Sequence, residues 1–392
     1  MKSAKPMLTR MFTAFFNSEK SSGIVLIIAT VISLVIANSA FGSDYQAIWK
    51  LYIGGMSLEH WINDALMAVF FLLIGLELER ELYSGELSDF RQALLPLFAA
   101  LGGIIVPALI HFSLNAGSDT QAGIGIPMAT DIAFALGVLA MLGKRVPTAL
   151  KVFVVAYAVI DDLSAIIVIA LFYTAEVSVL YLAGALAVWA LLFALNRYFR
   201  VMSLVPYLLG GALMWFFMFK SGVHATIAGV MLAFAIPYSN KADDEKSPSY
   251  KLEHFLHRPV AFVILPIFAL ANTAVILGAD WMQGLASSNS LGITAGLIFG
   301  KPLGVTLLSF IAVATGLSSL PSGLNWRQIF GAGILGGIGF TMSIFITNLA
   351  FTGDASLISA SKIAILFASL AAGSFGFLWL YFLGRPTPAA DR

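Results

Sequence analysis

The chain has 392 residues, of which 59% are hydrophobic and only 11% are charged, and its mean hydropathy is +0.91. Because a soluble domain carries about 25% charged residues, this composition excludes a cytosolic enzyme and a disordered protein. The net charge of +1 provides no basic surface for nucleic acid, and the absence of cysteine excludes disulfides, thiolate metal sites and a cysteine nucleophile. Long apolar stretches without the two-residue alternation of barrel strands predict an all-α polytopic membrane protein.

The apolar stretches predict twelve transmembrane helices. In chain order they lie near residues 23–40, 58–80, 92–114, 121–142, 148–173, 178–197, 203–219, 222–238, 257–277, 290–313, 328–350 and 359–384. Ahead of the first span, Phe12, Phe15 and Phe16 beside Arg10 predict an amphipathic segment on the membrane surface. The leader before Gly23 is long for a signal peptide, so the first helix is predicted to be retained.

Two polar segments between predicted spans have sequences that suggest what they form. Residues 50–58, KLYIGGMSL, fit equally a short hairpin turning at Gly54-Gly55 and an irregular external loop. The stretch from Tyr238 to Arg258, which contains Asp243, Asp244 and Glu245, is predicted to be a cytoplasmic linker. Since no loop is long enough for a soluble domain, residues 1–392 are predicted to form a single membrane domain.

The distribution of basic residues predicts the orientation. Of the 22 Lys and Arg residues, Lys50, Lys220 and Lys362 lie on one side of the predicted membrane, and Lys301 falls within a span. All the others lie on the side of the N-terminus, which is the positive-inside pattern. Both termini are therefore expected in the cytoplasm, in agreement with an even number of spans.

The fourth and eleventh spans contain residues that interrupt a helix. The fourth reads GIGIPMATDIAFALG over 123–137, and the eleventh reads GAGILGGIGFTMS over 331–343. Glycine weakens a helix and proline removes one of its hydrogen bonds, although glycine is also common where membrane helices pack closely. Spans 3–5 and 10–12 run in opposite directions, so the two interruptions occupy matching places in inverted repeats. This arrangement is typical of the site of a transporter.

The adjacent acids Asp161 and Asp162, in VIDDLSAII, are the strongest sign of a site. An ionisable residue within the bilayer costs about 2.5–3.5 kcal/mol on insertion scales, so such residues usually serve a function. Adjacent helical residues point about 100° apart, which lets both carboxylates border one cavity. Two close carboxylates repel, so they hold protons or a hard cation more readily than they stay doubly charged. The pair predicts cation/proton exchange; the alternative is a structural pair satisfied by lysine or helix ends.

Asp131, which follows Thr130, and Lys301 are predicted to act around the interruptions. If the two broken spans unwind where they cross, two half-helix N-termini and two C-termini meet at mid-membrane. We expect Asp131 to neutralise the N-terminal ends and Lys301 the C-terminal ends, with direct ion ligation as the rival role of Asp131. Lys301 fits a second role equally well, in which it pairs with Asp161 or Asp162 when sodium is absent and releases a proton when sodium binds.

Other ionisable residues gather at predicted span ends. They are Glu77, Glu79, Arg80 and Glu81 in GLELERE, and Glu253, His254 and His257 in KLEHFLH. Histidine titrates near neutral pH, so this cytoplasmic group can attract cations and respond to pH, although the residues alone favour ordinary solvated helix ends. Asp64, in WINDALMAVFF, supports the site, lines the cytoplasmic funnel or is a hydrogen-bonded core residue. His111 and His224 lie near span ends, where water reaches more easily.

Six motifs occur in the order and spacing of the NhaA family of bacterial sodium/proton antiporters. They are WINDALMAVFFLLIGLE, ATDIAFALGVL, VIDDLSAII, KSGVHAT, IFGKPLG and GGIGFTMSIFI, and the sequence resembles this family over nearly its whole length. The resemblance implies twelve spans, with a core of spans 3–5 and 10–12 (about 92–173 and 290–384) and an interface part from the rest (about 23–80 and 178–277). The link between interrupted inverted repeats and transport sites was itself drawn from transporters that include this family.

The resemblance also implies roles for individual residues. Asp161 and Asp162 match the ion-binding pair, Thr130 and Asp131 the crossing in span 4, and Lys301 the lysine of span 10. Positions linked to pH response are matched by Glu77, Arg80, Glu81, Glu253, His254 and His257, and the histidine of KSGVHAT by His224. Residues 50–58 fall where the family has its external dimer hairpin, which implies a homodimer, although this segment is short. Glu79 replaces the basic residue of familiar members, which points to a different pH range.

The resulting prediction is an antiporter of the bacterial inner membrane that uses the proton gradient to expel Na⁺ or Li⁺ by alternating access. By resemblance it is electrogenic and pH-regulated; no enzymatic activity, cofactor or nucleic-acid partner is expected, and its surroundings are the lipid bilayer. A sodium-coupled symporter would need further polar groups for an organic solute. An intramembrane aspartyl protease would need acids on facing helices, whereas Asp161 and Asp162 are adjacent. A passive channel suits a buried carboxylate pair and lysine less well than tight binding and exchange.

Overall fold

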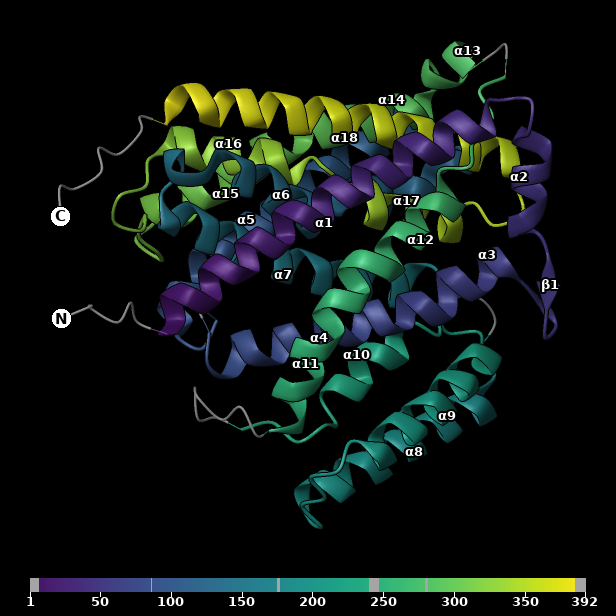
Figure 1. Cartoon of the computed structure of the whole chain (residues 1–392). Coiled ribbons are helices and arrows are strands. Elements are labelled where there is room, and N and C mark those ends of the chain that lie inside the picture. The colour runs from purple at the N-terminus through teal and green to yellow at the C-terminus, as the bar shows by residue number, and fades with distance from the viewer. Residues whose placement is uncertain (1–6, 86, 175–176, 240–246, 279–280, 385–392) are drawn as a thin grey trace. The chain divides into compact units, whose positions relative to one another are not determined.

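The computed structural model describes residues 7–85, 87–174, 177–239, 247–278 and 281–384. Within these residues, eight single helices are long and apolar enough to cross a membrane, and the bent pair α16 (Trp326–Gly336) and α17 (Phe340–Ala350) makes a ninth (Figure 1). The chain is therefore an all-α polytopic membrane protein. Three predicted spans are shorter, since the apolar helix in the first span covers Ser21–Ala37, α9 (Val205–Ser221) has 17 residues and α10 (Ile227–Ala233) has seven. Twelve spans and the inverted repeats stay a prediction.

The described residues divide into two compact units. Unit 1 takes them from 1–31, 94–161 and 277–392, and unit 2 from 32–93 and 162–276. Three of the divisions fall inside continuous helices, which are α1 (Met7–Ala37), α5 (Phe90–Asn115) and α7 (Thr148–Phe172). Each of these helices therefore contributes residues to both units.

Unit 1 contains the two interrupted spans and the helices that surround them. Its other elements are η2 (Asp119–Met128), α6 (Ile132–Leu142), η3 (Gly143–Arg145), α13 (Trp281–Leu285), α14 (Ser288–Ala295), η5 (Gly296–Gly300), α15 (Lys301–Ala314) and α18 (Ala355–Leu383). The long helix α18, yellow in Figure 1, packs against α14, α16 and α17. Helices α5 and α15 touch through backbone, because a Cβ added at Gly102 would lie 2.0 Å from the carbonyl oxygen of Gly304.

The predicted interruptions of spans 4 and 11 are confirmed. Span 4 is a 3₁₀ helix as far as Met128, then extended at Ala129 and Asp131, and becomes α-helical only at Ile132. Span 11 ends its first half at Gly336 and resumes at Phe340, with a bend of 46°. The 3₁₀ geometry of η2 was not predicted; its glycines and Pro127 explain why the segment does not settle as an α-helix.

A widened helical turn precedes Lys301. The π-helical turn η5 leads directly into α15, whose second residue is Pro302. Proline has no N–H and its ring collides with the carbonyl four residues earlier, so the backbone before it must open. Widened turns of this kind are frequent at functional sites.

Unit 2 begins with the second part of α1 and contains the confirmed hairpin. Its other elements are α2 (Gly42–Trp49), β1 (Tyr52–Ile53), β2 (Met56–Ser57), α3 (Leu58–Trp61), η1 (Ile62–Leu66), α4 (Met67–Tyr83), α8 (Val179–Arg197), α11 (Pro248–Pro259), η4 (Val260–Ile264) and α12 (Leu265–Asn272). Strands β1 and β2 pair antiparallel, with Ile53 opposite Met56. Gly54 and Gly55 both have positive φ, as the two-residue turn of a hairpin requires.

Two sequence predictions need correction. The predicted linker ends at Arg258, but α11 already begins at Pro248, where the Ser247 hydroxyl caps the helix by accepting from the Tyr250 amide at 3.2 Å. Asp243, Asp244 and Glu245 lie outside the described residues. The predicted helix 222–238 is α-helical only over α10, because Gly222 ends α9 in a left-handed conformation. Helix α1 runs without a break from the predicted surface segment into the first span, and the location of that segment on the membrane surface stays a prediction.

Candidate functional site

The centre of the site is a buried ion pair in unit 1. Lys301, the first residue of α15, places its Nζ 2.9 Å from Oδ2 and 3.1 Å from Oδ1 of Asp161 in α7. Neither side chain has any solvent exposure. The ring of Tyr157, one turn before Asp161, lies 5.9 Å from Nζ and offers a cation–π contact. Removing one member of such a pair leaves an uncompensated charge in a low-dielectric interior.

Thr130 connects this ion pair to the interruption of span 11. Its hydroxyl donates to the carbonyl oxygen of Gly336 at 2.9 Å and accepts from the hydroxyl of Tyr157 at 2.8 Å. The hydroxyl and the backbone amide of Thr130 also interact with the Asp161 carboxylate. The unwound part of span 4 thus touches both α7 and the C-terminal end of α16.

Asp131 binds the N-terminal ends of both second half-helices. Its Oδ1 accepts from the amide of Phe134 in α6 at 3.0 Å, and its Oδ2 accepts from the amide and hydroxyl of Thr341 in α17 at 3.0 and 2.5 Å. The amide of Asp131 itself donates to the carbonyl of Ile338 at 2.6 Å. Partial positive charge collects at helix N-termini, so one buried carboxylate between two of them is well placed as the predicted counter-charge.

Hydroxyl groups reach the carbonyls at the two C-terminal ends. Ser343 in α17 donates to the carbonyl oxygen of Ile126 near the end of η2 at 2.7 Å, and Thr130 donates to that of Gly336 at the end of α16. The bonds of Lys301 given above go to Asp161. The action of Lys301 on these C-terminal ends therefore stays a prediction.

Asp162 follows Asp161 on α7, and each residue is 1% exposed. Adjacent positions on a helix face about 100° apart, so the two carboxylates leave the helix in different directions. The division between units 1 and 2 falls between these two residues. The structure thus confirms that both acids are buried, and it pairs Asp161 with the lysine named from the sequence.

The ionisable group that was predicted to be cytoplasmic forms a network in unit 2. Arg80 in α4 pairs with Glu253 in α11, and its Nη2 lies 3.2 Å from Oε1 of Glu81. The Arg80 side chain keeps 38% of its exposure, whereas Glu253 is 6% exposed as a residue. Glu77, one turn before Arg80 and Glu81, interacts electrostatically with all three. The structure therefore brings together four of the six residues that the resemblance links to pH response.

The remaining residues of this group lie around the network. Glu79 is buried and its Oε2 accepts from the Ser249 hydroxyl of α11 at 3.3 Å. His254 is exposed and stacks on Tyr250, with ring centroids 4.0 Å apart. His257, one turn after Glu253, is half-buried. Two α4–α11 contacts thus involve a buried glutamate, which makes the group more than a solvated helix end.

Asp64 lies at the other end of the same span. Its Oδ2 is 2.7 Å from Nε2 of His60, and the indole of Trp215 donates to its backbone carbonyl at 3.3 Å. Thirteen helical residues, or about 20 Å, separate Asp64 from Glu77, so the two residues lie at opposite ends of this span, and the role of Asp64 stays a prediction. His224, whose Nε2 donates to the carbonyl of Tyr173 at 2.7 Å, interacts electrostatically with Asp64.

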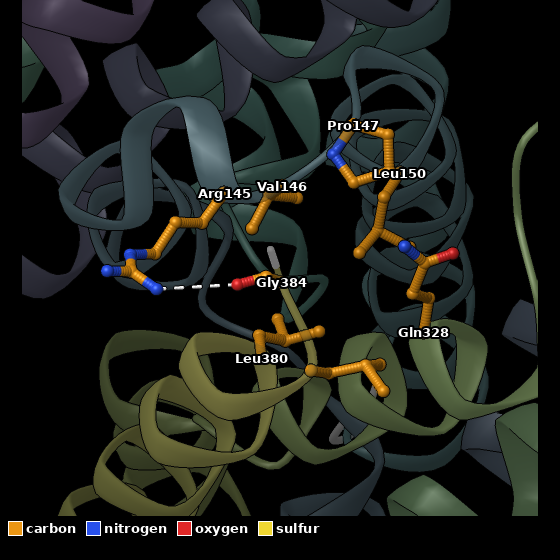
Figure 2. A pocket seen from close by; sticks show the side chains of 8 residues that line it. Arg145, Val146, Pro147, Leu150, Gln328, Leu380 and Gly384 are labelled. Atoms are coloured by element: carbon orange, nitrogen blue, oxygen red, sulfur yellow. Dashed lines mark hydrogen bonds between the residues drawn. The ribbon is translucent and has the colours of Figure 1, made fainter. Parts of the chain in front are cut away.

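A separate shallow depression lies at the ends of α7, α16 and α18 in unit 1 (Figure 2). Arg145 donates to the carbonyl of Gly384 there at 3.4 Å, and its guanidinium lies 4.0 Å from the ring centroid of Tyr381. Leu150, which lines it, precedes Asp161 by eleven residues of α7, or about 16 Å. The Lys301–Asp161 pair therefore lies in close packing away from this depression.

The whole arrangement can be compared with known proteins. A family model described as Na+/H+ antiporter 1 matches residues 13–380. The chain belongs to this family. It is 69% identical over 382 residues to the Na(+)/H(+) antiporter NhaA of Dechloromonas aromatica, covering 97% of this chain and 98% of the relative. It is 58% identical over 373 residues to the protein of that name from Cytophaga hutchinsonii, covering 95% of each.

The sequence pattern could identify only some of the residues in this arrangement. Charged residues inside apolar spans, such as Asp131, Asp161 and Lys301, are visible in a single sequence. Tyr157, Thr341 and Ser343 were missed, although each hydrogen-bonds within the crossing. The signal for the last two was their position directly after GGIGF, where a broken helix exposes backbone groups that hydroxyls can satisfy. For Tyr157 the only signal was its place one turn before Asp161.

Proposed function

We propose that the protein exchanges Na⁺ or Li⁺ for protons across the bacterial inner membrane, using the proton gradient to expel the cation. The observation that carries this proposal is the fully buried Lys301–Asp161 pair at the crossing of two broken helices. Membership of a sodium/proton antiporter family supports the choice of ions. Asp161 and Asp162 are proposed as the ligands of the cation, with Thr130 beside them.

The ion pair supports a direct competition between cation and proton. A sodium ion on the Asp161 carboxylate would lie within a few ångströms of the Lys301 ammonium. Two unit charges of the same sign 4 Å apart repel by about 4 kcal/mol at an effective dielectric constant of 20. Lys301 must therefore release its proton or leave the carboxylate when the cation binds. Because a buried lysine can lose its proton, cation entry is linked to proton release.

Electrogenic exchange and alternating access extend this proposal. If Lys301 and the acid pair both release protons, more than one proton moves for each sodium ion. The two broken spans support alternating access, because helices that are already interrupted can move as separate halves. Asp131 would keep the half-helix N-termini neutral in both arrangements.

Regulation by pH is proposed for the Arg80–Glu81–Glu253 network. It joins two helices of unit 2, and its carboxylates are buried while Arg80 remains partly exposed. Protonation of a carboxylate would weaken the α4–α11 link. Glu77, His254 and His257 would adjust the pH at which this happens.

The topology is proposed to consist of twelve spans with both termini in the cytoplasm. The basic residues support this orientation, and the hairpin β1–β2 then lies outside. Its exposed strand, with Tyr52 78% exposed, supports pairing with the hairpin of a second copy. The short hairpin favours a weaker dimer than a longer one would form.

The deciding experiment measures sodium-induced collapse of a pH gradient in everted membrane vesicles. The wild type should respond to Na⁺ or Li⁺ and not to K⁺. Asp162→Asn should abolish the response while leaving the Lys301–Asp161 pair intact, and Asp161→Asn should abolish it as well. Asp354→Asn, which changes an exposed carboxylate outside the spans, is the matched control and should retain activity. Substantial exchange by both Asp161→Asn and Asp162→Asn would contradict the shared site.

A further inference from the structure

A buried chain of polar side chains lies in unit 1, apart from the ion pair. His111 in α5 contacts Asn289 at the start of α14, with Nε2 3.1 Å from Oδ1, and Asn289 contacts Ser361 in α18, with Nδ2 2.8 Å from Oγ. All three residues are 0% exposed. In the orientation of the proposed function, on which this inference rests, these are the external ends of the three helices.

The hydrogen bonds define the tautomer of His111. The Ser361 hydroxyl donates to the carbonyl of Leu357 at 2.7 Å, so its oxygen accepts the N–H of Asn289. The side-chain oxygen of Asn289 then faces His111 and can only accept, which makes Nε2 of His111 the donor. In a neutral imidazole the other nitrogen, Nδ1, must therefore carry the free lone pair.

The Nδ1 lone pair of His111 is buried among tightly packed residues. Within the part of the chain that the structure describes, Nδ1 of His111 has no hydrogen-bond partner. A methyl group added at Gly123 would lie 3.1 Å from Nε2, so the ring is tightly surrounded. Asn115 clamps the same end, because its amide donates to the carbonyls of His111 and Ser288 at 2.9 and 3.1 Å. A buried acceptor without a donor calls for a functional explanation.

The elements packed around His111 offer no buried counter-charge. Among their described residues near this end, α14 carries no titratable group, η2 carries the exposed Asp119, and α18 carries Lys362 and the exposed capping residue Asp354. Lys362 has the same sign as an imidazolium. A protonated His111 in the closed packing would thus be a buried charge without an acid beside it, which is strongly unfavourable.

We propose that His111 is a second proton-binding site, and that its protonation is coupled to opening of the external ends of α5, α14 and α18. A proton from external water bonds to Nδ1 and converts the imidazole to an imidazolium. The charged ring is stable only where Nδ1 reaches water, so proton binding and opening favour each other. Neutral His111 keeps the chain to Asn289 and Ser361 closed.

The same helix connects this site to the ion pair. A Cβ added at Gly103 of α5 would lie 3.6 Å from Nζ of Lys301. His111 is eight residues, or about 12 Å, further along α5. Movement of this end of α5 therefore acts on the helix that packs against Lys301, which gives the external proton a route to influence exchange.

The first test is nitrogen-15 NMR of histidine-labelled protein in nanodiscs, without sodium. The chain has five histidines, so His111 is assigned by His111→Gln or, if that variant does not fold, by elimination with His60, His224, His254 and His257 variants. We expect an Nε2–H tautomer at high pH that gains a second proton as the pH falls. An Nδ1–H tautomer, or no titration between about pH 5 and pH 9, would overturn the proposal. This readout does not depend on transport, so failure of the proposed function leaves it intact.

The second test is sodium exchange in oriented vesicles with the internal pH fixed and the external pH varied. A single proton site changes its occupancy about tenfold per pH unit on the high-pH side of its midpoint. His111→Gln should flatten this external dependence, whereas His60→Gln, which removes a half-exposed histidine, should not. Ser361→Ala keeps the imidazole and loosens the closed chain, so it should move the midpoint to higher pH, and Ser361→Thr should restore it. An unchanged external profile in His111→Gln would refute the coupling.

Discussion

The crossing in unit 1 and the Arg80–Glu81–Glu253 network in unit 2 both pair basic with acidic side chains, but in different surroundings. In the crossing, Lys301 and Asp161 have no exposure, and Asp131 is 2% exposed. In the network, Arg80 keeps 38% of its side-chain exposure beside two buried glutamates. Water can compensate a lost partner only in the second case. The crossing is therefore suited to obligatory exchange of one charge for another, and the network to gradual adjustment.

Asp131→Ala should cause the largest loss of stability, and it tests most directly whether the buried crossing depends on its charges. The substitution removes an acceptor from three donors at two helix N-termini. Hydrogen bonds to charged groups contribute about 1.5–3 kcal/mol each, so the loss of three such bonds should lower stability by at least about 4.5 kcal/mol. Thermal unfolding in detergent measures it, with Thr341→Ala as a control that removes one donor only. A small loss for Asp131→Ala would show that the helix ends need no counter-charge.

Substitutions of Lys301 test whether the fully buried pair is only structural or also carries a proton. Removing one partner of such a pair costs about 3–5 kcal/mol, so Lys301→Ala should destabilise the fold. Lys301→Arg keeps the charge but cannot lose a proton, so it should retain the fold and sodium transport with less charge moved per cycle. The current per sodium ion in reconstituted membranes distinguishes a proton-carrying role of Lys301 from a structural one. Equal charge per sodium in wild type and Lys301→Arg would exclude the carrier role and leave the structural one.

The contrast between the two regions also explains what could be read from sequence. Asp161, Asp131 and Lys301 stand out because charge within an apolar span is rare, and the Gly and Pro residues of spans 4 and 11 predict their breaks. The hydroxyl partners Thr341 and Ser343 could not be assigned, because each bonds to a residue more than 200 positions away. The early start of α11 was missed although Ser247-Pro248 is a helix-start signal, since a polar sequence outweighed it.

Substitutions in and around the Arg80–Glu81–Glu253 network should have intermediate effects. Glu77→Gln, Glu81→Gln, Glu253→Gln and His254→Gln should each shift the pH profile of exchange more than they lower its maximal rate. Arg80 keeps 38% of its side-chain exposure and can turn to water when a partner is lost, so a smaller loss is expected than for the fully buried Lys301–Asp161 pair. The measurement is sodium-induced collapse of the pH gradient over a range of pH. Unchanged profiles in all four variants would return the network to an ordinary helix end, without a regulatory role.

The smallest effect on stability is expected for Asp354, whose carboxylate is wholly exposed, in contrast to the buried carboxylates of the two regions. Asp354 caps α18 and accepts from the amide of Leu357 at 2.9 Å and from the amide and hydroxyl of Ser356 at 3.1 and 2.9 Å. The amide of Leu357 and the hydroxyl of Ser356 hold the pKa of Asp354 below its ordinary value.

A lowered pKa in the folded state means that the charged cap adds stability above the pKa of the unfolded chain, near pH 4, and loses it as the pH falls through the folded-state pKa. Asp354→Asn keeps a neutral cap, so its melting temperature should lie slightly below that of wild type at pH 6 and approach it near pH 3. Asp354→Ala lacks the cap and should stay less stable at both. A constant difference between wild type and Asp354→Asn would show that the charge of this cap contributes nothing, and that even hydrogen-bonded carboxylates matter here only when buried.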